Sequence, residues 1–312
     1  MPRTFARYAA ALLVFNLAVI LWGAFVRVSG SGAGCGNHWP LCNGVVVPQA
    51  PATATVIEFT HRAMTGLDVV AVAILLVWAF RAFPRRHPVR LGAALSAVFL
   101  SSEALIGAAL VKLEHVAHNA SVGRAYSLSG HLVNTLTLLA CLTLTAWWAA
   151  GARRLQWRGR AAWWAVLGCF LFVLLGISGA IAALGDTLFP AHSLAQGLRQ
   201  DFDPAASVFL RLRLLHPMLA VGTAAWLAFY AMRHRRWSLV ALLALQVAAG
   251  ALNLLLLAPA WMQLLHLLLA DLVWISLVLL AASTLQGPPL PVDSLADEMA
   301  PRVGGLVRLA PR

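Results

Sequence analysis

The chain has 312 residues, of which 61% are hydrophobic and only 11% are charged, with a mean hydropathy of +0.80 and a formal net charge of +12. A water-soluble domain is normally about a quarter charged, so this composition excludes a soluble fold and indicates an integral membrane protein. A nucleic-acid-binding role is disfavoured, because the basic residues fall in short loops with no binding module around them.

Eight apolar runs are long enough to cross a hydrocarbon core of about 30 Å as helices. They are predicted at residues 8–28, 60–80, 91–111, 129–150, 161–184, 208–231, 238–257 and 261–284. The first run follows Arg3 and Arg7, so a cleaved signal peptide is the alternative there. The run is too long for a signal core and has no convincing cleavage site. The expected fold class is therefore all-α integral membrane.

The distribution of basic residues predicts the orientation. With the N-terminus in the cytoplasm, sixteen of the 23 Lys and Arg residues fall in inner segments, and the remaining seven fall outside. The positive-inside rule then places both termini in the cytoplasm, in a multi-pass protein of the cell (plasma) membrane. Residues 287–312 are rich in Pro and end in mixed charge, which predicts a disordered cytoplasmic tail.

The first outer loop contains a polar, glycine-rich stretch at residues 29–44, with two cysteines, Cys35 and Cys42. Disulfides persist on the oxidising side of a membrane, and the glycines and Pro40 can supply the bend that brings the two cysteines together. A disulfide is the favoured interpretation, either redox-active or purely structural. A metal-binding pair completed by His38 is the alternative.

Four histidines lie near the outer ends of predicted spans. They are His61, His131, His216 and His266, in the second, fourth, sixth and eighth spans. These even-numbered spans all run in the same direction, so the four imidazoles are expected at similar depth. Ionisable groups in spans are costly and usually functional, and neutral imidazole is a natural metal or haem ligand. The alternative is four unrelated interfacial histidines.

The two halves of the chain resemble each other. EFTHRAMTG in the second span corresponds to RLLHPMLAVG in the sixth, 155 residues later, and WGAFVR in the first corresponds to SGAIAA in the fifth. EALIGAALV in the third span and QVAAGALNL in the seventh align Glu103 with Gln246, and Gly107 with Gly250. The predicted architecture is two pseudo-symmetric four-helix bundles related by an axis near the membrane normal.

Each predicted bundle, residues 1–152 and residues 153–286, holds two of the histidines on different helices. Two imidazoles that face each other across a bundle make the ligand set of a six-coordinate haem. The predicted pairs are His61 with His131 and His216 with His266.

The two pockets differ at one position. Glu58 precedes His61 by three residues, which puts both on one helix face, whereas Arg213 precedes His216 by the same spacing. A carboxyl group near a haem ligand can act as a general acid or base. It can equally cap the start of the helix, where negative charge is favoured, and the spacing does not choose between these roles.

The motifs AFVRVSGSGAGC, HWPLCNG, EFTHR, SGHLVNT, LLHPMLA and LLHLLLADL occur in this order across nearly the whole chain. In this respect the sequence resembles the haem A synthase family, whose members take part in the assembly of a-type terminal oxidases. The resemblance implies an oxidoreductase that converts the C8 methyl group of haem O to a formyl group by successive hydroxylations and loss of water.

The resemblance also implies a role for each candidate site residue. The iron of the substrate haem O would be flanked by His61 and His131, with Glu58 as the catalytic residue beside the reacting edge. The iron of a resident haem b, which delivers electrons, would be held by His216 and His266. Haem O synthase and an unidentified electron donor are the protein partners that fit this role, and a homo-oligomer is compatible with the sequence.

The cysteine loop would carry the family's outer disulfide, between Cys35 and Cys42. The sequence departs from the family pattern in two places. Some relatives have a second cysteine pair in the outer loop of the second half, but residues 185–207 contain none, which excludes a mechanism that needs two disulfides. His38 also stands before Trp39, where the family commonly has an acidic residue.

Two other functions remain open from the residues alone. A dihaem b-type membrane electron-transfer cytochrome without haem-modifying activity needs the same four histidines. A transporter or haem carrier can also be built from repeats, but transporters tend to have broken helices in both halves, and the sequence shows no paired interruption. Glu58 and the asymmetry of the halves favour the enzyme.

Overall fold

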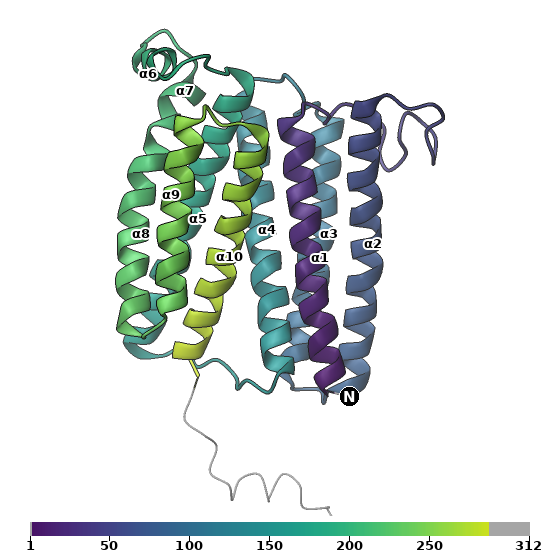
Figure 1. The fold of residues 1–312 in the computed structure, drawn as a ribbon. Helices are drawn as coiled ribbons and strands as arrows, with labels where there is room; N and C mark the ends of the chain where they lie inside the picture. Colours follow the sequence, from purple (N-terminus) through teal and green to yellow (C-terminus); the bar gives the residue numbers. More distant parts are fainter. Residues whose placement is uncertain (1, 287–312) are drawn as a thin grey trace, which may run out of the picture.

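The computed structural model of the chain describes residues 2–286 as a bundle of long helices that begins and ends at the same end of the molecule (Figure 1). The predicted tail, residues 287–312, lies outside the described residues. The helices are α1 Pro2–Val28, α2 Thr53–Ala82, α3 Pro88–Lys112, α4 Val122–Ala149, α5 Gly159–Leu188, α6 Leu194–Phe202, α7 Val208–Arg213, α8 Leu215–Arg233, α9 Trp237–Leu255 and α10 Ala260–Thr284.

Eight spans in the described part of the chain are long and apolar enough to cross a membrane, with α7 and α8 together forming the sixth. The all-helical fold class is therefore confirmed. Helices satisfy every backbone hydrogen bond within one segment, which a bilayer requires. The helices continue past the apolar runs: α2 begins at Thr53, seven residues before the predicted span. Glu58 consequently lies inside a helix and not at its start.

The sixth span is interrupted at Leu214, between α7 and α8. Pro217 explains the break, because a proline has no amide hydrogen to donate to the carbonyl of Arg213, and its ring crowds that carbonyl. The matching helix of the first half, α2, is continuous from Thr53 to Ala82. The interruption is thus confined to one half, as expected from the absence of a paired signal in the sequence.

The long helices pack as two rings of four. In the first ring α1 packs on α2, α2 on α3, α3 on α4 and α4 on α1, and in the second the order is α5, α8, α9, α10 and back to α5. In this arrangement α2 lies diagonally across from α4, and α8 across from α10. The two rings meet where α4 contacts α5 and α10 (Figure 1). Their relation by a symmetry axis stays a prediction.

Buried contacts of Trp274 connect the two rings of helices. The indole of Trp274 on α10 donates a 2.7 Å hydrogen bond to the carbonyl of Leu136 on α4 and stacks on Phe172 of α5 at 5.3 Å between ring centroids. Accordingly, α4 is the most buried of the eight candidate spans. Apolar side chains on the outer surface are widely exposed, as in Trp163 at 77%, which suits contact with lipid.

Candidate functional site

The structure brings His216 of α8 and His266 of α10 together across the second ring. Their ring centroids are 6.4 Å apart, and the ring planes are nearly perpendicular, at 88°. A metal ion bound by two imidazole nitrogens at about 2 Å each would hold the centroids roughly 6 Å apart. The spacing of the two rings therefore fits a single iron bound between them.

Both imidazoles of this pair lie against glycines of neighbouring helices. A β-carbon at Gly179 of α5 would lie 2.9 Å from Cε1 of His216, and one at Gly250 of α9 would lie 3.0 Å from Cε1 of His266. The hydroxyl of Ser178 also lies 3.0 Å from Nδ1 of His216. These neighbours fix the orientation of the His216 ring, in the way that hydrogen bonds to one ring nitrogen orient metal-binding histidines.

The first ring is built differently. His61 of α2 also rests on a glycine, since a β-carbon at Gly23 of α1 would lie 2.9 Å from its Cε1. His131 of α4, diagonally opposite, has no such seat, because nothing lies within 4 Å of the β-carbon position of Gly107, the repeat partner of Gly250. His61 and His131 lie within electrostatic range of each other. The two imidazoles of this pair are thus supported by different neighbours.

His131 instead contacts a carboxylate, Glu103 of α3. Nδ1 of His131 lies 2.9 Å from Oε1 of Glu103, without forming a regular hydrogen bond. The side chains of Asn134 and Thr135 donate to the same carboxylate. Glu103 was not among the predicted site residues, although an acidic group inside a span is a functional signal. Its repeat partner Gln246 is likewise beside a histidine, 3.4 Å from Nε2 of His266.

Glu58 links the helix of His61 to the outer loop. Its side chain is buried, and Oε2 accepts a 2.8 Å hydrogen bond from the backbone amide of Cys35. Oε1 accepts from Nε of Arg62, one turn further along α2, at 3.1 Å. The helix-capping alternative for Glu58 is wrong, because α2 begins five residues earlier and Glu58 bonds to the loop and not to the helix terminus.

The cysteine loop is fastened to α2 by two further side chains. Nη1 of Arg62 donates to the carbonyls of His38 at 2.7 Å and Leu41 at 2.8 Å. The hydroxyl of Thr55 donates to the carbonyl of Gly34 at 2.7 Å. Sequence reasoning missed both anchors, although the four-residue spacing of Glu58 and Arg62 is typical of a helical ion pair.

The two cysteines of this loop form a disulfide, Cys35–Cys42, with their Cα atoms 4.4 Å apart. Both sulfurs are buried in a segment that otherwise lies on the surface. The metal-binding alternative with His38 is wrong, because cysteines joined to each other offer no thiolate to a metal. The disulfide closes a loop that rests on α2 about one turn above His61.

Arg213 anchors the outer segment of the second half. Its guanidinium pairs with Asp186 of α5 at 2.7 Å and with Asp201 of α6 at 2.6 Å. It also donates to the carbonyl of Gly197 at 3.3 Å. In both halves, the residue three positions before the first histidine therefore holds an outer segment in place, but with opposite charge.

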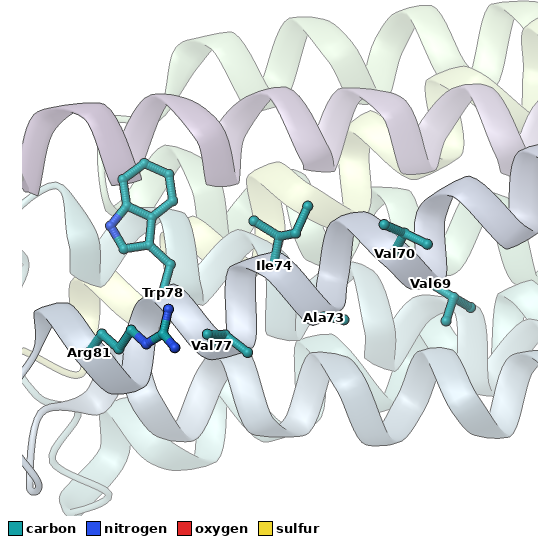
Figure 2. Close-up of a pocket in the computed structure, with 7 residues that line it drawn as sticks. All are labelled: Val69, Val70, Ala73, Ile74, Val77, Trp78 and Arg81. Atoms are coloured by element: carbon teal, nitrogen blue, oxygen red, sulfur yellow. The ribbon is translucent and has the colours of Figure 1, made fainter.

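A surface groove on α2 is separate from the histidines (Figure 2). It is lined by Val69, Val70, Ala73, Ile74, Val77, Trp78 and Arg81. Its aliphatic side chains are mostly exposed, with Val70 at 57%, whereas Trp78 is partly buried and packs against Phe5 of α1. In a membrane this surface would contact acyl chains, and we assign no reaction to it.

The donor set fits two haem groups, one in each ring. Each ring offers a pair of imidazoles on diagonal helices, and Nδ1 of both His61 and His266 is buried without a hydrogen-bond partner. Three glycines make room for the imidazole rings, and the chain supplies hydrogen-bond partners beside two of them. Such pairs can hold the iron of a porphyrin from both sides.

Comparisons with known proteins identify the family of the chain. A family profile described as "Cytochrome oxidase assembly protein" matches residues 6–278. A "Protoheme IX farnesyltransferase" of Thermus thermophilus is 47% identical over 90% of this chain and 48% of its own length. A "Heme A synthase" of Geobacillus kaustophilus is 42% identical over 36% of this chain and 35% of its own, and one of Lysinibacillus sphaericus is 40% identical over 33% and 34%.

The match to the Thermus protein covers nearly all of this chain, whereas the chain spans about half the length of that relative. The matches to the haem A synthases are shorter, about a third of each chain. The family profile covers most of the chain, including all four histidines. The chain therefore belongs to the family of cytochrome oxidase assembly proteins that includes the haem A synthases, and it is a multi-pass membrane protein.

Proposed function

We propose that this chain acts as a haem A synthase, an oxidoreductase that converts the C8 methyl group of haem O to a formyl group by successive hydroxylations and loss of water. The observation that carries the proposal is the pairing of imidazoles on diagonal helices of two rings, with the carboxylate of Glu103 beside His131 in the first ring, where the amide of Gln246 lies beside His266 in the second. The similarity to proteins named "Heme A synthase" supports it.

In this proposal the second ring holds the resident cofactor. His216 and His266 would hold the iron of a haem b, which when bound supplies a centre for electron transfer. The imidazole rings of His216 and His266 both lie against glycines, and the distance between their centroids suits one iron. A closely filled pocket of this kind favours a group that stays bound.

The first ring would bind haem O as substrate, between His61 and His131. In this ring His131 lies against the carboxylate of Glu103 and not against a glycine, which distinguishes it from both histidines of the second ring. Glu58 would be the catalytic residue, holding or accepting a proton at its carboxylate. Arg62 fixes that carboxylate in position, and the cysteine loop would exclude water at the outer end of the pocket.

The orientation in the plasma membrane and the partners belong to the same proposal. The excess of arginine in the inner segments supports cytoplasmic termini, which fusions of a periplasmically active reporter to each end would test. A haem O synthase is the proposed supplier of substrate, because a relative twice as long as the chain is named for haem farnesylation.

A second candidate function is electron transfer by a dihaem cytochrome without haem modification. It is favoured by one observation: both carboxylate oxygens of Glu58 are engaged, one by the loop and one by Arg62. A carboxylate fully used as an anchor has less freedom to exchange protons with a substrate.

Analysis of haem products separates the two functions. The chain is expressed in cells with and without a source of haem O, and the extracted porphyrins are identified by mass spectrometry. Formyl or hydroxymethyl haem that appears only with both the chain and haem O supports the synthase. Unchanged haem O beside a normally folded, haem-containing protein would contradict the synthase and leave the electron-transfer cytochrome.

A further inference from the structure

The short helix α6 exposes its apolar face and turns its polar face toward the protein. Leu194, Leu198 and Phe202 follow one another at four-residue spacing, so they form a stripe along one face of the helix. Their side chains are exposed by 49%, 57% and 71%. The partly buried positions of the same helix are Gln196, Gly197, Gln200 and Asp201, which means that the polar face is turned toward the protein.

Specific contacts hold α6 in this inverted orientation. Nε and Nη2 of Arg213 donate to Oδ1 of Asp201, and Nη2 also reaches the carbonyl of Gly197. At its start, the hydroxyl of Ser193 caps the helix by accepting from the amide of Gln196. Rotating the helix to bury the apolar stripe would break the ion pair with Asp201, so the outward stripe is built into the structure.

The position of α6 identifies what surrounds this stripe. The helix connects the end of α5 at Leu188 with the start of α7 at Val208, and both belong to candidate membrane spans (Figure 1). It packs on α7, whose first residue Val208 is 40% exposed, and Met218, further along the same candidate span, is 71% exposed. The stripe thus lies at the end of two candidate membrane spans.

The size of the stripe argues against a second protein as its partner. Three side chains on a nine-residue helix fall far short of the 20 to 30 residues, or about 800 Å² on each side, of a standard stable interface. An interfacial helix with leucines and a phenylalanine on one face and flanking basic residues is, in contrast, a common lipid-binding element. The exposed Arg199 beside the stripe suits a phosphate headgroup.

We propose that α6 is an interfacial helix whose Leu194–Leu198–Phe202 stripe lies in the outer lipid leaflet, at the boundary between headgroups and acyl chains. Lipid is then the partner of this surface, and Arg213 is the residue that presents the stripe to it. The proposal does not depend on the haem chemistry, because it rests on the exposure, spacing and anchoring of α6 alone.

Collision measurements on spin-labelled protein test the proposal. Single cysteines are introduced as Leu198→Cys or Phe202→Cys in a chain whose free cysteines, Cys141 and Cys169, are replaced by alanine. Each variant is labelled with a maleimide nitroxide and reconstituted in phosphatidylcholine and phosphatidylglycerol vesicles. Accessibility to oxygen, which concentrates in lipid, is compared with accessibility to a water-soluble nickel chelate.

Matched control positions are His192→Cys and Ala205→Cys, which are exposed in the connections on either side of α6. We expect the ratio of oxygen to nickel accessibility to be several-fold higher at the stripe than at both controls. Equally low ratios at all four positions would show that the stripe is in water and would overturn the proposal. Low accessibility to both reagents at the stripe would show that protein covers it, which would overturn the proposal in favour of a second copy or another chain.

Discussion

At the scale of single residues, Glu58 combines a structural role in the outer loop with a proposed catalytic role. Its carboxylate holds the backbone of Cys35 and the guanidinium of Arg62, and it also lies one turn from His61, the proposed ligand of the substrate haem. A substitution that removes the carboxylate can therefore act through the loop or through the chemistry. Thr55 separates the two effects, because it anchors the same loop through Gly34 without contributing an ionisable group.

Glu58→Gln is expected to reduce the conversion of haem O by about 100-fold or more if the carboxylate moves protons. The amide oxygen of glutamine can still accept from Cys35, so the loop should stay in place. Thr55→Val removes one anchoring hydrogen bond, costs about 1 kcal/mol of stability and should leave most of the turnover. Turnover is measured as haem product per protein, with thermal unfolding of each variant as the control for folding. Equal losses in both variants would contradict a catalytic carboxylate.

His87 predicts a pH dependence of stability. Its Nδ1 accepts from the amide of Val89 at the start of α3. Burial first, and the charge of Arg154 second, lower the pKa of His87 below its usual value. As pH falls below about 6.5, His87 binds a proton more readily in the unfolded chain than in the folded chain. The free energy of unfolding therefore decreases toward acid, and the contribution of His87 is fully present above this pH.

The measurement for His87 is the unfolding temperature of the purified protein between pH 5 and pH 8. His87→Asn keeps a side-chain acceptor at the same cap but does not titrate, so its unfolding temperature should fall less steeply toward acid. His234, whose pKa is also lowered by burial and by Arg233 and Arg236, is present in both proteins and does not affect the difference. Parallel pH curves for the two proteins would refute the assignment.

At the scale of elements, the anchoring of α6 depends on one arginine. Arg213 is 9% exposed and neutralises both Asp186 and Asp201. Arg213→Leu leaves two carboxylates without their partner and should cost about 3–5 kcal/mol of stability. Trypsin should then cut faster after Arg199, which lies on α6.

Arg211→Leu is the matched control for this prediction, since Arg211 lies on the same helix α7 but is exposed. It should change stability by no more than about 0.5 kcal/mol and leave the cleavage rate after Arg199 unchanged. Both quantities are measured in detergent, by thermal unfolding and by limited proteolysis. A similar loss in the two variants would mean that the ion pairs of Arg213 do not hold α6.

The sequence predicts some elements well and others poorly, for physical reasons. The eight spans are predictable because the thickness of the bilayer requires a long apolar run in each. The nine residues of α6 have no such run, and only Ser193 with Gln196 three residues later and the spacing of the leucines mark them. The break at Leu214 could have been predicted from Pro217, because the effect of a proline is local.

Some contacts of the candidate site could likewise be predicted from the sequence, and others could not. His216 and His266 could be paired from their positions in helices that run in the same direction. The contact between Glu103 and His131 could not, because it depends on how α3 and α4 rotate against each other, which side-chain packing decides. The anchoring of the loop by Arg62 is likewise a tertiary contact that no spacing within the loop specifies.

At the scale of the whole molecule, the two rings share a plan but differ in how they hold their imidazoles. Gly107 and Gly250 are repeat partners, yet only the β-carbon position of Gly250 is close to a histidine, 3.0 Å from Cε1 of His266. Gly250→Ala should therefore displace that imidazole and reduce the haem b retained on purification, whereas Gly107→Ala should retain it. The absorbance of haem per protein is measured. Equal retention of haem in the two variants would contradict a role for Gly250 in positioning His266.

The division of labour between the rings gives the last prediction. Replacing His216 or His266 by alanine removes one of two axial ligands of the resident haem, so the low-spin b-type spectrum of the purified protein should weaken or change. Replacing His61 or His131 should abolish the conversion of haem O and leave most of that spectrum intact, since the two pockets lie in different rings. Absorption spectra of the reduced proteins and product analysis are made on the same preparations. If His61→Ala strips the resident haem while His216→Ala keeps it, the assignment of substrate to the first ring and cofactor to the second is reversed.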